Sequence, residues 1–289
     1  MRRVFLVGCP RSGTTLLQTM LAQHPQVFTV PETHYFRKIR GRFGDRAAGP
    51  FVSPRAASRA LDSLVAAVAA SARPSVPRWW PFKQRYVRSF VSVMDDGASR
   101  YGATVWVEKS PIHLHHLEEI TEAVPGVGFV HLARDGRDVV ASLVNLCELE
   151  PDLWVPQLLP DQPRSSERRT LIDAAVARWN ADFNRSLEWQ GSRSHFHVTY
   201  DGLVDALRPT LEGIAAFLEI PYDPAMERHW ESADEVVGPR REKQHMAKTF
   251  QPLEDRRLHR FRTFFTESEQ ERIVAGLTGG GDTGAVAHS

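Results

Sequence analysis

Several features that would place a chain in a special class are missing here. Only two cysteines, Cys9 and Cys147, occur among 289 residues, too few for a disulfide framework, and no Cys or Cys/His spacing predicts a zinc site. No apolar run approaches the roughly 20 residues that span a bilayer, and the first one, residues 4–7, is too short for a signal peptide. The net charge is only +1, so no chain-wide field favours nucleic acid or an anionic membrane. We expect a cytoplasmic protein with neither partner.

Short β-rich apolar runs alternate with longer stretches of helical spacing. The predicted strands are residues 4–7, 27–30, 104–107, 127–132 and 195–199, and the predicted helices are 14–24, 55–72, 82–100, 112–123, 137–147, 170–189, 204–218 and 267–277. This alternation is typical of an α/β fold with a mainly parallel sheet. Without an internal repeat or a linker, we expect one domain over residues 1–277, followed by a flexible tail at 278–289 that is mostly Gly, Ala, Thr and Ser.

A basic segment interrupts this neutral chain. Residues 37–88 carry twelve Lys and Arg side chains but only two acids, Asp45 and Asp62. One interpretation is a solvated helical insertion, at 37–100, whose charge is balanced by acidic stretches elsewhere. The other is a basic cap with Trp79, Trp80 and Phe82 that admits an anionic or aromatic substrate.

A glycine-bounded loop follows the first predicted strand. It reads Gly8-Cys9-Pro10-Arg11-Ser12-Gly13-Thr14-Thr15 and leads into an amphipathic helix. Loop N–H groups and a helix dipole that converge on one point form an anion site. Thr14 stands where a triphosphate-binding loop has its lysine, so the loop favours a single 5′-phosphate group, with Arg11 as the nearby cation.

With this loop, the chain resembles the sulfotransferases that use 3′-phosphoadenosine-5′-phosphosulfate (PAPS), in particular the branch of the protein-tyrosine sulfotransferases and many bacterial enzymes. The matching motifs come in the family's order over about residues 1–203: His24-Pro25, Pro31-Glu32-Thr33-His34, Glu108-Lys109-Ser110-Pro111, Arg134-Asp135-Gly136-Arg137-Asp138-Val139-Val140-Ala141-Ser142 and Val198-Thr199-Tyr200-Asp201-Gly202-Leu203. The resemblance implies a P-loop-like three-layer fold, with a helical insertion, and a small-molecule acceptor such as a bacterial natural product.

The resemblance also assigns donor-binding residues. It implies that Arg11, Ser12, Gly13, Thr14 and Thr15 hold the 5′-phosphosulfate. A strand that ends at Arg134 and leads into Ser142 about two helical turns later can place a guanidinium and a hydroxyl on one phosphate, and the family holds the 3′-phosphate there. The competing interpretation is a helix start with ordinary capping.

Two further donor contacts are expected from the later part of the chain. Tyr200 matches a family element that contacts the nucleotide or fixes the loop around it. Lys248 is the best candidate in a basic stretch at 238–262, where the family has a lid; the alternative there is a solvated loop.

Three residues match the tasks of sulfuryl transfer. Glu32 follows the second predicted strand, at the carboxyl edge where ligands of parallel sheets bind, and the family places its catalytic base at this position. Lys109 and Arg11 are expected to stabilise charge on the transferring group, although Lys109 has an alternative as a salt-bridge partner of Glu108 or Asp135. His34 is a competing base, because histidine titrates nearest neutral pH.

No metal is expected. His113, His115 and His116 lack a ligand spacing with acids or cysteines, so a helix surface is the preferred interpretation, and His195 and His197 are expected to pack on one strand face.

The rival functions are an ATP-dependent small-molecule phosphotransferase and a non-catalytic nucleotide-binding protein of the same fold. The acceptor, O- versus N-sulfation and the oligomeric state, a homodimer included, cannot be read from the sequence.

Overall fold

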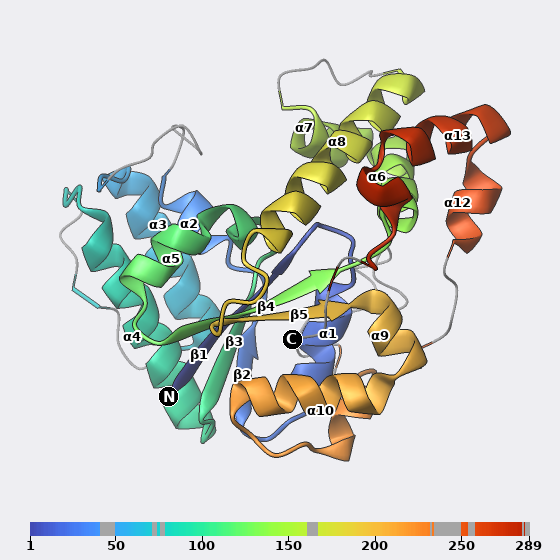
Figure 1. Ribbon diagram of the computed structural model, residues 1–289. Helices are drawn as coiled ribbons and strands as arrows, with labels where there is room; N and C mark the ends of the chain where they lie inside the picture. Colours follow the sequence, from blue (N-terminus) through green and yellow to red (C-terminus); the bar gives the residue numbers. More distant parts are fainter. Residues whose placement is uncertain are drawn as a thin grey trace. The chain divides into compact units, whose positions relative to one another are not determined.

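The fold is described from a computed structural model, which covers residues 1–40, 50–70, 74–75, 79–160, 167–231, 233, 250–253, 258–284 and 286 (Figure 1). A central five-stranded sheet with the order β2-β3-β1-β4-β5 is flanked by helices. β1 pairs in parallel with β3, and β3 with β2. The predicted α/β class with a mainly parallel sheet is confirmed.

The strands lie close to the predicted runs. They are β1 (Arg2–Gly8), β2 (Val27–Val30), β3 (Val105–Lys109), β4 (Val127–Ala133) and β5 (His195–Thr199). β1, β3 and β4 are buried along most or all of their length, as expected for strands of a parallel sheet that is covered on both faces. Their sequences are accordingly continuous apolar runs rather than alternating ones.

The chain folds into two compact units. The first comprises Met1–Val7, Thr15–Val130 and Arg208–Pro252, and the second comprises Gly8–Thr14, His131–Leu207 and Leu253–Ser289. The boundaries divide β4 and separate the glycine loop, Gly8–Thr14, from the rest of the first helix, so each unit holds a part of the motifs singled out above.

The first unit carries most of the helices that precede β4. They are α1 (Thr14–Ala22), α2 (Tyr35–Lys38), α3 (Pro54–Val68), α4 (Lys83–Tyr101), the 3₁₀ helix η2 (Pro111–His116) and α5 (Leu117–Ala123), joined later in the chain by α10 (Leu207–Leu218) and η3 (Pro224–Arg228). Pro111 at the first helical position suits η2, and the predicted helix at 112–123 is therefore a 3₁₀ turn followed by α5.

Aromatic rings fill the core of the first unit. Phe5 of β1 packs against Phe90 of α4 at 5.9 Å, Trp106 of β3 at 5.5 Å and Phe129 of β4 at 5.9 Å between ring centroids. Replacing such a buried ring by alanine costs about 3–5 kcal/mol. Gly97 of α4 is also fixed by packing, because a Cβ atom there would lie 2.5 Å from the Val68 side chain.

The second unit is mainly helical. Its elements are α6 (Gly136–Leu149), α7 (Pro151–Leu158), α8 (Arg168–Leu187), α9 (Tyr200–Asp205), α12 (His259–Phe264), α13 (Glu267–Gly276) and the 3₁₀ turn η6 (Thr278–Gly281). Asp135 caps α6 by accepting a hydrogen bond from the Arg137 N–H at 2.9 Å, and Trp179 and Phe183 of α8 stack at 4.6 Å.

One predicted helix differs from the structure, and part of the predicted tail is described. The single helix expected at 204–218 is two, α9 and α10, because Ala206 leaves the helical conformation (φ −142°, ψ 54°) just before Pro209, which suits the first turn of a new helix. The tail expected to be flexible at 278–289 packs in its described part: Gly281, Thr283 and Val286 are buried. Val286 joins the core of the second unit, an apolar contact that outweighs the small-residue composition around it.

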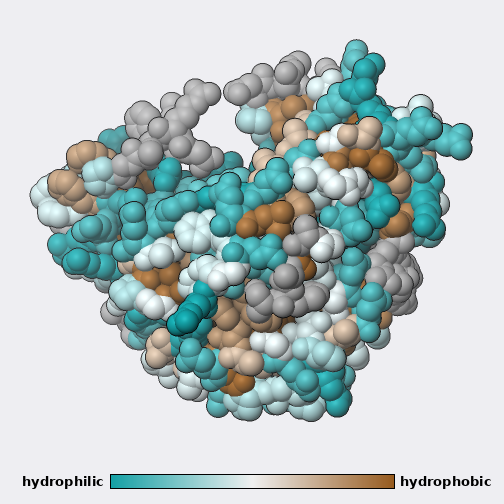
Figure 2. Space-filling view, in the orientation of Figure 1, coloured by the Kyte–Doolittle hydropathy of each residue, from teal (hydrophilic) through white to brown (hydrophobic). Residues whose placement is uncertain are grey.

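The visible surface is largely hydrophilic with small hydrophobic patches (Figure 2). The large apolar side chains exposed in the described parts of the chain are Met1, Phe51, Trp79, Phe82, Tyr101, Leu149, Leu153 and Val274. No helix in these parts is long and apolar enough to cross a membrane.

Candidate functional site

The carboxyl ends of β2 and β3 bring Glu32 and Lys109 together. Val30, the last residue of β2, is opposite Glu108 in the parallel register, so Glu32 lies just past the edge at which Lys109 ends β3. Lys109 Nζ forms an ion pair with Glu32 Oε1 and donates a hydrogen bond to Thr15 Oγ1 at 3.1 Å. Thr15 is the second residue of α1, directly after the glycine loop. The ion-pair partner of Lys109 is therefore Glu32, and not Glu108 or Asp135, which were the alternatives from the sequence.

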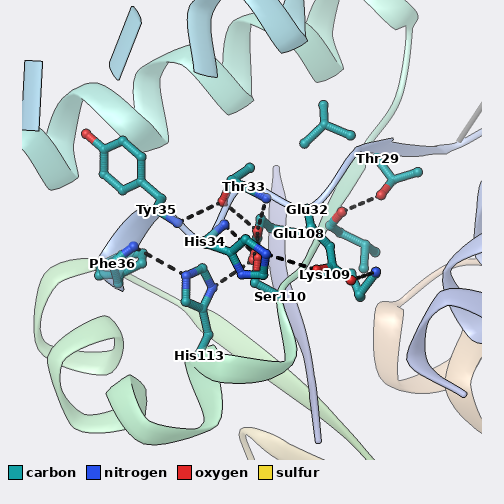
Figure 3. Close-up of polar contacts among 12 residues, drawn as sticks. Thr29, Glu32, Thr33, His34, Tyr35, Phe36, Glu108, Lys109, Ser110 and His113 are labelled. Carbon is teal, nitrogen blue, oxygen red and sulfur yellow. Dashed lines mark hydrogen bonds and ion pairs between the residues drawn. The ribbon is translucent and has the colours of Figure 1, made fainter. Parts of the chain in front are cut away.

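His34 contacts the other oxygen of the Glu32 carboxylate. Its Nε2 lies 3.1 Å from Glu32 Oε2 (Figure 3). Its Nδ1 is buried and has no hydrogen-bond partner among the described residues. The backbone of His34 is left-handed, with φ 49° and ψ 32°, which is uncommon for a residue other than glycine. The imidazole thus presents Nε2, and not Nδ1, to the carboxylate.

The charges around Glu32 favour its ionised form. Burial on its own would raise the pKa of the carboxyl group. The charge of Lys109 and the hydrogen bonds from His34 and Lys109 outweigh this effect and hold the pKa well below its ordinary value. Glu32 is therefore a carboxylate at neutral pH, with each oxygen next to one nitrogen.

A second carboxylate, Glu108, lies wholly inside the first unit. Its Oε1 accepts hydrogen bonds from Thr33 N at 3.3 Å, Thr33 Oγ1 at 2.6 Å and Ser110 Oγ at 2.7 Å, while Oε2 lies 2.8 Å from His113 Nδ1 (Figure 3). Burial opposes its charge, but the hydrogen bonds from His113, Ser110 and Thr33 lower the pKa of Glu108. A buried charge with four donors is adequately compensated.

In the second unit, the glycine loop is shaped by close contacts. A Cβ atom at Gly8 would lie 2.4 Å from the Leu132 carbonyl oxygen, and one at Gly13, whose φ is +100°, would lie 2.9 Å from Tyr200 Cδ2. Neither position accepts a side chain. The Ser12 side chain is buried, and its Oγ has no hydrogen-bond partner among the described residues. An orphaned hydroxyl inside such a loop suits an incoming acceptor group.

Arg11 and Ser142, predicted on different phosphates, contact each other. Arg11 Nε donates to Ser142 Oγ at 3.2 Å, and the guanidinium lies 5.9 Å from the ring centroid of Trp154 in α7. Arg11 also has a left-handed backbone, with φ 74°. The contact joins two residues that the sequence analysis assigns to different phosphates.

Arg134 follows β4 and is held on two sides. Its Nη2 donates to Asp138 Oδ2 at 2.8 Å, and its guanidinium lies over the Tyr200 ring at 4.0 Å. Asp138 Oδ1 also accepts the N–H of Leu258, at 2.9 Å. Arg134 Nε is buried without a hydrogen-bond partner among the described residues. The contacts with Asp138 and Tyr200 fix the orientation of the Arg134 guanidinium. Its Nε–H can still donate a hydrogen bond.

The structure thus gathers the predicted residues in two groups. Glu32, Lys109 and Thr15 lie together in the first unit, and Arg11, Ser12, Gly13, Ser142, Arg134 and Tyr200 belong to the second, with Thr14 at the start of α1. Lys248 lies outside the described residues. The prediction of a surface for the three histidines of η2 is wrong for His113 and His116, which are buried because each has a carboxylate partner, Glu108 and Glu119.

Several residues escaped the sequence-based assignment. Glu108, Ser110 and Thr33 belong to the quoted motifs, but a sequence cannot show that their side chains bond to one another. Asp138 was visible only as part of a helix start. The described residues contain no group of three or more His, Cys, Asp or Glu that could hold a metal ion.

Comparisons with known proteins agree with these motifs. The model of the Sulfotransferase family matches residues 3–224, and no curated protein matches the chain. Among solved structures, a sulfotransferase domain from the curacin biosynthetic pathway has a TM-score of 0.55 and 19% identity, over 94% of this chain and 95% of that one. One from the olefin synthase of Synechococcus PCC 7002 has a TM-score of 0.54 and 18% identity, over 91% and 94%.

A mouse sulfotransferase, SULT7A1, complexed with PAP, has a TM-score of 0.52 and 12% identity, and covers 98% of this chain and 85% of its own. At these identities, the structures show a common fold. The family model covers the loop, the Glu32 and Lys109 positions and the Arg134 helix. The chain is an enzyme of the sulfotransferase family.

Proposed function

We propose that this enzyme transfers a sulfuryl group from PAPS to a hydroxyl or amine of a small-molecule acceptor and releases 3′,5′-ADP. The observation that carries the proposal is the contact of Lys109 with both Glu32 and Thr15. It joins a carboxylate and a cation to the first turn of the helix that follows the glycine loop. The PAP in the mouse structure supports the choice of donor.

The residues of the second unit suit a donor with two phosphate positions. The orphaned Ser12 Oγ and Arg134 Nε are unused donors, and the hydroxyl of Thr14, the loop N–H groups and Arg11 would hold the 5′-phosphosulfate. Arg134 and Ser142 would hold the 3′-phosphate. The Tyr200 ring, which the Arg134 guanidinium stacks on, would keep that guanidinium in place. The phosphosulfate supplies an activated sulfuryl group.

Glu32 acts as the general base. It takes the proton of the acceptor hydroxyl while the acceptor oxygen forms its bond to sulfur and the bond from sulfur to the phosphate oxygen breaks. Lys109 and Arg11 stabilise the negative charge that develops on the departing phosphate. A positioned base contributes about 10²–10⁴-fold to such a reaction.

The ion pair between Lys109 and Glu32 couples these two tasks. While Lys109 is paired with Glu32, it weakens the basicity of the carboxylate, as the lowered pKa of Glu32 indicates. When Lys109 turns its charge toward the departing oxygen, that restraint is removed and Glu32 becomes a stronger base. Base and cation are therefore most effective at the same stage of the reaction.

The decisive experiment compares Glu32→Gln with Glu122→Gln, a matched control at an exposed position of α5. Labelled PAPS is offered with a panel of phenols, alcohols and amines, and 3′,5′-ADP binding is measured by calorimetry. We expect Glu32→Gln to keep nucleotide binding and to lose at least about 100-fold in turnover, and the control to lose neither. If turnover of Glu32→Gln is unchanged, the role of general base would be assigned to His34 instead.

The same assay separates the rival functions. Phosphate transfer from labelled ATP would favour a phosphotransferase. A non-catalytic protein would bind 3′,5′-ADP, and replacement of Glu32 and Lys109 would have no measurable consequence. The cytoplasmic location and the lid role of Lys248 stay predictions from the sequence, and the identity of the acceptor and the oligomeric state stay open.

A further inference from the structure

The loop after β2, residues 32–36, is held by side chains that take up its backbone N–H groups. Thr33 N donates to Glu108 Oε1 at 3.3 Å, and His34 N donates to Ser110 Oγ at 2.9 Å. Tyr35 N donates to Thr33 Oγ1 at 3.1 Å, and Phe36 N donates to His113 Nε2 at 3.3 Å. Four successive N–H groups thus have side-chain acceptors (Figure 3), including those at the start of α2, which a helix leaves without a partner.

These acceptors all depend on Glu108. Thr33 Oγ1 and Ser110 Oγ each donate their proton to Glu108 Oε1, which leaves their lone pairs for Tyr35 N and His34 N. His113 Nε2 accepts from Phe36 N, so the proton of the neutral imidazole is on Nδ1, which donates to Glu108 Oε2. One ionised carboxylate therefore fixes the orientation of two hydroxyls and the tautomer of one imidazole.

Packing prevents the pair from rearranging. Glu108 and His113 are each 0% exposed. The His113 ring packs edge-on against Phe36 at 5.2 Å and against Phe5 at 5.7 Å between centroids. An imidazolium at His113 would leave the Phe36 N–H without an acceptor, and a neutral carboxyl at Glu108 would lose one of its acceptor positions.

The segment that this network holds is strained and carries the candidate base. His34 is in the left-handed region, a strained conformation that persists only where its surroundings enforce it. Glu32 lies immediately before the four bonded N–H groups, and His34, among them, contacts Glu32 through Nε2. Because successive residues of a strand face opposite sides of the sheet, Glu108 supports the loop from the side opposite to Lys109.

We propose that Glu108 and His113 are positioning residues for the reaction: they hold the loop 32–36 so that Glu32 and His34 keep their working geometry. The proposal rests on the proposed function, in which Glu32 is the base. A misplacement of about 1 Å in a catalytic group costs about 100-fold in rate. The pair would influence turnover without touching donor or acceptor.

The first test replaces one member of the pair. In Glu108→Gln, an amide NH2 replaces one of the two carboxylate oxygens, so either the His113 Nδ1–H or the hydroxyls of Thr33 and Ser110 lose their acceptor. We expect turnover to fall about 10–100-fold, while 3′,5′-ADP affinity and the KM for the acceptor change less than about 3-fold. His113→Phe, which keeps the ring packing, should behave alike. Unchanged turnover in both variants would overturn the proposal.

Non-additivity distinguishes positioning from general destabilisation. If Glu108 acts through Glu32, Glu108→Gln has no further effect on turnover in a Glu32→Gln background, whereas an equal fall in both backgrounds would refute the proposal. A matched control is Asp95→Asn, which breaks another carboxylate network of the first unit, with Arg3 and Trp106. It should lower the Tm but leave turnover within about 2-fold.

Hydrogen exchange tests the network independently of the acceptor and of Glu32. The amides of residues 33–36 should exchange at least about 10-fold faster in Glu108→Gln than in the wild type, and in Asp95→Asn at the wild-type rate. Equal protection in Glu108→Gln would overturn the proposal even if Glu32 proves to be the base. If Glu108→Gln does not fold, Ser110→Ala, which removes only the acceptor of His34 N, should expose that amide and lower turnover.

Discussion

Arg11 donates a hydrogen bond from Nε to the hydroxyl of Ser142, at 3.2 Å. The residue predicted on the 5′-phosphosulfate thereby contacts the residue predicted on the 3′-phosphate. Ser142→Ala should weaken 3′,5′-ADP binding about 10-fold, because a hydrogen bond to a charged group contributes about 1.5–3 kcal/mol, and should weaken 5′-AMP binding much less. Calorimetry with both nucleotides measures the difference. Equal losses would place Ser142 with the 5′-group.

Arg134 should decide between nucleotides with and without a 3′-phosphate. Arg134→Met is expected to weaken 3′,5′-ADP binding at least about 30-fold, since the loss of one partner from a buried charge pair costs about 2 kcal/mol or more. Binding of 5′-AMP should change little. Arg137→Met is the matched control, because Arg137 is bound to Asp135 on the same helix and should not alter the preference. A preference that survives in Arg134→Met would refute the assignment.

Lys109→Met removes both the proposed charge stabilisation and the main cause of the low pKa of Glu32. Turnover should fall about 10²–10³-fold, with a smaller loss in nucleotide affinity. Because the pKa of Glu32 rises when the cation is removed, the acid limb of the remaining activity should move to higher pH. Lys83→Met, which breaks the ion pair with Glu119, is the control. A loss confined to affinity would make Lys109 a binding residue.

The variant His34→Asn tests the role of the His34 side chain while the left-handed backbone at this position is kept. Asparagine tolerates the left-handed conformation but is too short to replace Nε2 beside Glu32. We expect turnover to fall about 10-fold at constant 3′,5′-ADP affinity, which is less than the loss in Glu32→Gln. The reverse order of the two losses, measured in one assay, would identify His34 as the base.

The buried histidines of the second unit should make stability depend on pH. His131 hydrogen-bonds with Ser186 and His195 and stacks on His197 at 4.4 Å. Burial and then the neighbouring His197, His195 and Arg185 lower the pKa of His131 well below its usual value, and burial lowers that of His197 as well.

The unfolded chain therefore binds more protons than the folded one below about pH 6.5, and the free energy of unfolding decreases as the pH falls from there. As the pH falls below about 6.5, His131 should contribute a progressive loss of stability. Urea denaturation should show a shallower pH dependence for His131→Gln than for the wild type. Replacing the exposed His115 by glutamine should leave the slope unchanged, and an unaltered slope in His131→Gln would contradict the expectation.

The strand pattern placed Glu32 and Lys109 at the same edge of the sheet, because the carboxyl ends of parallel strands share one edge, but it did not predict their ion pair. Hydrophobic periodicity placed the strands well for the same reason: buried parallel strands are continuous apolar runs. The contact of Arg11 with Ser142 could not be read in this way, since it depends on side chains 131 residues apart. The four-donor environment of Glu108 was hidden too, because it joins β3, η2 and the loop after β2 by long-range side-chain bonds.

Gly97 links the basic insertion to the body of the first unit. There is no room for a Cβ atom between α4, the Val68 side chain and the Phe28 ring of β2, and Phe90 of the same helix packs on Phe5. The insertion is therefore not a module that can be deleted or exchanged between relatives as a block, since its removal would open the core around β1 and β2. Substitutions in this segment that keep the core intact are therefore confined to the exposed faces of α3 and α4.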